Sequence, residues 1–157
     1  MVILGIDPGL RSTGWGLIKH SSGPNYINCG VIEPKTTLPA EERLLALHNG
    51  VLEIIEKYEP KEIALEKVFV NTNGATTLKL GEARGVILMT PAKKGLKVAE
   101  YAPNTIKKTI TGIGHATKEQ VQKMVQLILA QKYDFHKKKD ATDALAIALC
   151  HYYYLRL

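Results

Sequence analysis

The feature that most constrains the fold is a strand–helix–strand pattern in the first half of the chain. Apolar residues over 41–58 recur at spacings of three and four, which predicts one amphipathic helix. The residues of this apolar face are Leu44, Leu47, Val51, Ile54, Ile55 and Tyr58. Glu59-Pro60 ends the helix, and the short apolar run 63–65 follows as a strand. This arrangement predicts a crossover connection, so the strand should pair in parallel with an earlier one.

The remaining periodicity extends this pattern to an α/β fold. Apolar runs at 2–6, 13–19 and 26–32 are joined by short turns, which predicts an antiparallel meander. Further elements are expected as a helix over 75–93, a strand over 97–101, and helices over 103–111, from Thr117 onward and over 140–154. The predicted fold is a mixed five-stranded sheet, three antiparallel strands and then parallel strands, flanked by helices. The length of 157 residues fits a single domain over residues 1–157.

The helix over 75–93 has apolar residues on more than one side, which predicts burial on two faces. Gly81 and Gly85 lie four residues apart on one side of it. Glycine inside a helix costs roughly 1 kcal/mol against alanine, so two of them indicate close backbone approach. The approaching surface is either the domain's own sheet or a second copy of the chain.

Composition and charge describe an ordinary globular protein with a basic excess. The chain is 45% hydrophobic and 23% charged, and its net charge of +6 is compatible with a phosphate-rich partner. No apolar run approaches the ~20 residues that span a bilayer, and no signal peptide is recognised. Cys29 and Cys150 lie in apolar runs without metal-ligand spacing, so we expect buried free thiols and a cytoplasmic location.

Four acidic residues stand at the ends of predicted elements. Asp7 ends the first strand and Glu66 ends the strand after the crossover, so parallel pairing would bring their carboxylates together at one sheet edge. Asp140 and Asp143 share one face of the first turn of the last helix. The three aspartates also have a simpler interpretation, because Asp-Pro-Gly forms turns and Asp caps helices. Two acids at the start of an otherwise apolar helix favour a functional site over simple helix capping.

Carboxylates that converge without a cation repel one another by several kcal/mol when partly buried. A hard divalent ion relieves this repulsion, and oxygen ligands favour Mg²⁺, or Mn²⁺, over zinc. A carboxylate site with lysines nearby indicates phosphoryl transfer, in which two ions activate a water and stabilise the leaving oxygen. The lysines would hold a nucleic-acid backbone or offset charge in the transition state.

Several motifs together resemble the RuvC family of bacterial Holliday junction resolvases. They are Gly5-Ile6-Asp7-Pro8-Gly9 with Thr13-Gly14, Glu66-Lys67-Val68-Phe69, Leu78-Lys79-Leu80-Gly81-Glu82-Ala83-Arg84-Gly85, Gly112-Ile113-Gly114 and Asp140-Ala141-Thr142-Asp143-Ala144-Leu145-Ala146. Each motif alone is weak. Their shared order and spacing over nearly the whole chain make a specific signal.

The resemblance implies a ribonuclease-H-like fold and Mg²⁺-dependent cutting of four-way DNA junctions by paired symmetric nicks. It implies that the acidic metal-binding set is Asp7, Glu66, Asp140 and Asp143. Lys107 and Lys118 match basic residues near the scissile phosphate, and Phe69 matches an aromatic residue near the junction crossover. It further implies a homodimer through the helix that carries Gly81 and Gly85, and action with the RuvA and RuvB branch-migration proteins.

Alternative functions differ in substrate or in class. Another ribonuclease-H-like nuclease with a different nucleic-acid substrate stays open, because no single motif demands four-way DNA. Asp-Pro-Gly with Thr13-Gly14 also resembles the phosphate loop of actin-like and sugar-kinase ATPases, but those enzymes need a second lobe for which 157 residues leave no room. A catalytically silent junction-binding module predicts the loss of at least one of the four acids, and all four are present.

Overall fold

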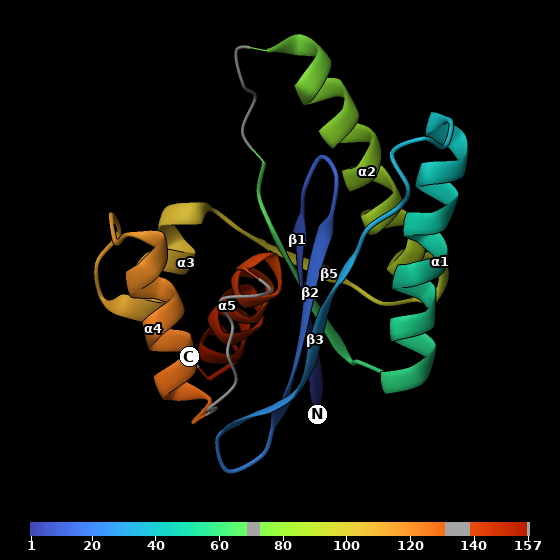
Figure 1. Ribbon diagram of the computed structural model, residues 1–157. Coiled ribbons are helices and arrows are strands. Elements are labelled where there is room, and N and C mark those ends of the chain that lie inside the picture. The colour runs from blue at the N-terminus through green and yellow to red at the C-terminus, as the bar shows by residue number, and fades with distance from the viewer. Residues whose placement is uncertain (69–72, 131–138, 157) are drawn as a thin grey trace.

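A computed structural model describes residues 1–68, 73–130 and 139–156, and its centre is a five-stranded mixed sheet (Figure 1). The strands are β1 (Val2–Pro8), β2 (Thr13–His20), β3 (Pro24–Ile32), β4 (Glu62–Glu66) and β5 (Val98–Tyr101). Their order is β3-β2-β1-β4-β5; the first three pair antiparallel, and β4 and β5 add in parallel. The predicted meander and crossover are therefore confirmed. That residues 1–157 form one domain stays a prediction.

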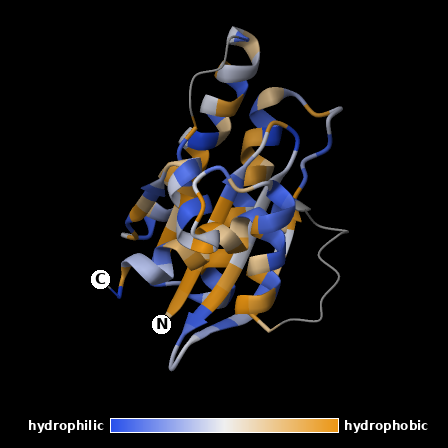
Figure 2. Cartoon of the chain, turned by 90° about the vertical axis from the view of Figure 1, so that its left-hand side faces the viewer, coloured by the Kyte–Doolittle hydropathy of each residue, from blue (hydrophilic) through white to orange (hydrophobic). Residues whose placement is uncertain are grey.

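Helices cover both faces of this sheet (Figure 1). They are α1 (Ala40–Tyr58), α2 (Gly74–Lys93), α3 (Pro103–Thr111), α4 (Lys118–Ile128) and α5 (Lys139–Tyr154). Helices α1 and α2 lie on one side, while α5 lies against the other with α3 and α4 outside it. In Figure 2 the strands are largely hydrophobic between these helical layers, as expected for a sheet covered on both faces.

Two buried clusters fill the two interfaces, and strand alternation decides which residues enter each. Along β1, Ile3 belongs to the cluster under α5, whereas Leu4 and Ile6 belong to the cluster under α1 and α2. Along β4, Ala64 faces α5 and its neighbours face α1. Because side chains alternate with a period of two, Asp7, the residue after Ile6, faces α5.

Residues at the far end of α5 attach it to the sheet. His151 is buried, with Nδ1 2.7 Å from the Tyr101 hydroxyl on β5 and Nε2 3.1 Å from the Glu62 carboxylate on β4. Cys29 and Cys150 are buried free thiols, as the sequence predicts. Within the described part of the chain, no helix has both the length and the hydropathy needed to cross a bilayer.

The prediction that α2 is buried on two faces is wrong for a single chain. Its buried residues, Ile87, Thr90 and Pro91, gather near its C-terminal end, whereas Leu78 is 66% exposed. A Cβ placed on Gly81 or Gly85 would meet nothing within 4 Å among the described residues. Helix α2 packs beside α1 at the edge of its layer (Figure 1), so no element described here covers its outer face.

Candidate active site

The two strand carboxylates meet at the carboxyl ends of the central strands. Ile6 on β1 is in register with Leu65 on β4, so Asp7 and Glu66 each follow a paired residue. Both side chains point to the α5 face by strand alternation. Pro8 is the last residue of β1 and is paired with Thr13, and the turn over residues 9–12 then leads the chain into β2. This juxtaposition is the one that the parallel crossover predicts.

Helix α5 lies unusually close to the sheet because glycines face it. A Cβ on Gly5 would lie 2.1 Å from the carbonyl oxygen of Ala144, and one on Gly14 would lie 2.1 Å from the carbonyl oxygen of Asp140. Gly16 is likewise in contact with Leu145. Such distances exclude any side chain, so the backbone of α5 contacts the strands directly. This contact holds the first turn of α5 beside the end of β1.

A pocket of about 190 Å³ joins the acids to both predicted lysines. Its lining residues are Asp7, Glu66, Pro103, Ile106, Lys107, Lys118, Val121, Asp143, Ala146 and Ile147. Lys118 Nζ lies 2.6 Å from Asp143 Oδ2, an ion pair in which the lysine side chain is half exposed. A capping box between Thr117 and Gln120 fixes the start of α4 and therefore the position of Lys118. Five of the predicted site residues thus share one cavity.

The electrostatics of Asp7 show how crowded this cavity is. Burial, and then repulsion from Glu66 and Asp143, raises the pKa of Asp7 to about 8. Asp140 adds to the rise, while Lys118 opposes it. Without a cation at the site, Asp7 therefore binds a proton near neutral pH.

Burial and nearby charges also shift the pKa values of the groups around Asp7. Burial raises the pKa of Glu66, with a further rise from Asp143, while Lys107 and Lys118 oppose it. Burial also raises the pKa of Asp143, against the hydrogen bond from Lys118. Burial disfavours the charged form of Lys118, but its hydrogen bond to Asp143 and the nearby acids leave its pKa raised. The pocket is therefore short of positive charge.

Asp140 is placed beside this pocket but does not line it. Its Oδ2 accepts a hydrogen bond of 2.7 Å from the hydroxyl of Ser12, in the turn between β1 and β2. Sequence reasoning missed Ser12. The available signal was its place in the Asp-Pro-Gly turn, but a serine in a turn is too common to single out. Phe69, the predicted aromatic contact, lies outside the described residues.

The residues in the pocket fit a divalent cation chemically. As they stand, no three His, Cys, Asp or Glu side chains within 1–68, 73–130 and 139–156 are grouped to hold a metal ion, and Asp143 is paired with an ammonium instead. Yet the donors are carboxylate oxygens, which suit Mg²⁺ or Mn²⁺. Burial, and then mutual repulsion, raises the pKa values of these groups, and a cation would stabilise the charged forms that both effects disfavour.

Comparison with known proteins gives a consistent result. Residues 3–151 match the family model described as crossover junction endodeoxyribonuclease RuvC. The RuvC of Rhodopseudomonas palustris strain TIE-1 is 54% identical over 95% of this chain and 85% of its own length. That of Ruegeria pomeroyi is 54% identical over 98% of this chain and 92% of its own.

A solved structure extends the similarity to three dimensions. RuvC of T. thermophilus, in complex with a Holliday junction substrate, superposes with a TM-score of 0.91 at 35% identity, covering 99% of this chain and 95% of its own. The shared architecture is the ribonuclease-H-like fold that the resemblance implies. The family match spans both strand carboxylates and both helix carboxylates, and the chain therefore belongs to the RuvC family.

Proposed function

We propose that this chain is a divalent-metal-dependent endonuclease that resolves four-way DNA junctions in recombination and repair. The observation that carries the proposal is one pocket holding Asp7, Glu66, Asp143, Lys107 and Lys118 in a member of the RuvC family. Relatives named crossover junction endodeoxyribonuclease, and a RuvC solved with a Holliday junction, support the choice of substrate.

The four acids are proposed as the metal-binding set, with Mg²⁺ as the natural ion, Mn²⁺ as a substitute and two ions per site during cleavage. Asp7, Glu66 and Asp143 would hold the cation within the pocket, with Asp140 beside them. When bound, the ions supply activation of a water and stabilisation of the leaving oxygen. Asp7 would then lose the proton that it binds near neutral pH, because the positive charge of the cation would offset the burial and carboxylate repulsion that raise its pKa.

The lysines act on the phosphate through charge. Lys107 lines the pocket beside Glu66 and forms no ion pair with any described residue. Lys118 is half exposed while it contacts Asp143, so its ammonium can face a phosphate that enters from solvent. Both are proposed to offset the negative charge that grows on the scissile phosphate in the transition state. Phe69 remains proposed as a stacking contact at the junction crossover.

A homodimer would supply the second active site for paired nicks. The outer face of α2 is exposed. Its residues recur at spacings of three and four and are Leu78, Gly81, Glu82, Gly85 and Met89. The glycines meet nothing in their own chain, which supports close approach by a second α2. Action with RuvA and RuvB, and a cytoplasmic location, are proposed from family membership.

One experiment tests the function. A synthetic four-way junction and a linear duplex of matching sequence are incubated with the protein in Mg²⁺ and in EDTA. We expect paired nicks in the junction only, dependent on Mg²⁺ and lost in Asp7→Asn, while Glu53→Gln, an exposed acid of α1, cuts normally. Equal cutting of the duplex would favour another nuclease of this fold, and cutting in EDTA would exclude the metal mechanism.

A further inference from the structure

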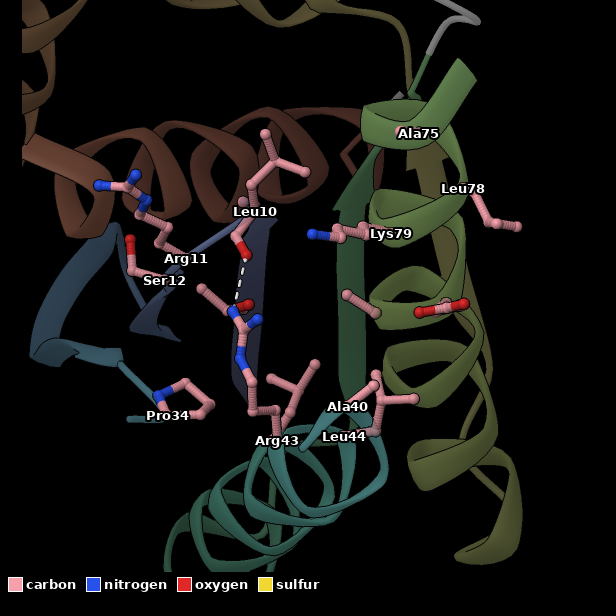
Figure 3. A pocket seen from close by; sticks show the side chains of 15 residues that line it. Leu10, Arg11, Ser12, Pro34, Ala40, Arg43, Leu44, Ala75, Leu78 and Lys79 are labelled. Atoms are coloured by element: carbon pink, nitrogen blue, oxygen red, sulfur yellow. Dashed lines mark hydrogen bonds between the residues drawn. The ribbon is translucent and has the colours of Figure 1, made fainter. Parts of the chain in front are cut away.

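A second pocket lies at the same end of the sheet but on its opposite face. It has a volume of about 280 Å³ and lies between the β1–β2 turn, the start of α1 and the first half of α2 (Figure 3). Leu47 and Ala83 in its lining belong to the cluster under α1 and α2, so the sheet separates this pocket from the carboxylates. The proposed cleavage reaction makes no use of it.

The charged groups of this second pocket are mainly cationic. Arg11 comes from the turn, Arg43 from α1 and Lys79 from α2, against the single carboxylate of Glu82 in the lining. In Figure 3, Lys79 extends from α2 toward Leu10 and the Arg43 guanidinium. None of the three cations forms an ion pair with a carboxylate among the described residues.

Arg43 has hydrogen-bonding capacity to spare. One of its Nη atoms donates to the carbonyl oxygen of Leu10 at 3.3 Å, while its buried Nε has no partner in the described structure. A buried donor without an acceptor carries a desolvation penalty, and an anion in the pocket would reduce it by placing negative charge near the guanidinium. Guanidinium and ammonium groups that line one pocket match the oxygens of a phosphate better than those of an uncharged ligand.

We propose that this second pocket binds the phosphate group of a nucleotide, with the attached sugar against its apolar wall. A volume of about 280 Å³ exceeds the needs of a bare anion, and Leu10, Leu44 and Ala83 supply apolar lining for the remainder. The nucleotide is either part of the DNA strand held for cleavage or free in solution. The DNA source rests on the proposed nuclease function; the phosphate chemistry does not.

The position of the pocket explains what a phosphate here would do. The turn over residues 9–12 forms part of its lining, and Ser12 in the same turn holds Asp140 on the opposite side. A DNA strand whose phosphate binds in the second pocket would therefore be held on one side of the turn over residues 9–12, with the cleavage site on the other side. These contacts would be independent of the metal. We expect these contacts to contribute affinity and strand position rather than bond breaking.

The DNA source is tested by binding without cleavage. Junction affinity is measured by fluorescence anisotropy in EDTA at several KCl concentrations for the wild type, Lys79→Gln and Lys61→Gln. Lys61 is an exposed lysine at the opposite end of the sheet, so its variant matches the charge change. Loss of one phosphate contact makes the negative slope of log K against log[salt] shallower by about 0.9. We expect this loss in Lys79→Gln only; an equal effect of both variants would overturn the DNA source.

The free-nucleotide source is tested on the protein alone. Titration with dTMP is followed by the ¹⁵N–¹H signal of Arg43 Nε, which we expect to shift in the wild type and not in Lys79→Gln if a free nucleotide binds. An unchanged salt slope together with an unmoved Arg43 signal would overturn the proposal. Because neither measurement requires cleavage, these outcomes are separate from a failure of the nuclease function, which would show as an uncut junction in Mg²⁺.

Discussion

Burial and neighbouring carboxylates act strongly on Asp7. Its ordinary pKa is 3.8 and its folded value is about 8, so between these values the folded state binds more protons than the unfolded state. Stability of the metal-free protein must therefore fall as pH rises through this window, by at most about 1.4 kcal/mol per pH unit from this group.

This slope gives a test by thermal unfolding in EDTA between pH 5 and pH 8. We expect Tm of the wild type to fall with pH, and Asp7→Asn to fall less and to exceed the wild type at pH 8, because the amide cannot ionise. Added Mg²⁺ should raise the Tm of the wild type at pH 8 and leave the variant nearly unchanged. A wild-type Tm independent of pH would contradict the burial of Asp7.

Ser12 offers a second test at the residue scale. Removing its hydroxyl leaves Asp140 without the 2.7 Å hydrogen bond, and bonds to charged groups contribute about 1.5–3 kcal/mol. We expect Ser12→Ala to weaken Mg²⁺ binding roughly tenfold by calorimetry, with a modest loss of stability. Ser22→Ala, in an exposed turn, is the control. Unchanged Mg²⁺ affinity would show that Asp140 needs no support from the turn.

At the scale of elements, the contact between α5 and the sheet determines where the helix carboxylates stand. Gly14→Ala would place a methyl group 2.1 Å from the backbone oxygen of Asp140, which only a shift of α5 can relieve. We expect a loss of about 1–3 kcal/mol in unfolding free energy and weaker cleavage. Gly23→Ala is the matched control, since a Cβ there meets nothing within 4 Å. Equal stability of the two variants would contradict the close packing.

Some of this arrangement could be predicted from sequence and some could not. The proximity of Asp7 and Glu66, which each follow the paired residues Ile6 and Leu65, could be predicted from two strand ends and the strand–helix–strand pattern between them. The ion pair between Lys118 and Asp143 depends instead on how α4 packs against α5, which no periodicity encodes. The burial of α2 was predicted wrongly because apolar residues on two sides do not reveal whether the second side meets the same chain.

At the scale of the whole molecule, the exposed face of α2 is the test of assembly. Leu78 on this face and Leu45 on α1 are 66% and 56% exposed, so changing either to Asp carries a similar cost in the single chain. We expect Leu78→Asp to sediment as a monomer and to lose paired nicking, whereas Leu45→Asp stays dimeric. If Leu78→Asp remained a dimer, another surface would have to form the interface.

The packing of α5 against glycine backbone also affects how the active-site geometry responds to temperature. Gly5 and Gly14 meet backbone atoms of α5 with no rotatable side chain between them, so at these two positions the interface cannot loosen by changes of rotamer. The spacing between the strand and helix carboxylates should then stay constant until cooperative unfolding begins. An Arrhenius plot of junction cleavage by the RuvC-family chain should accordingly remain straight up to that temperature and fall abruptly beyond it.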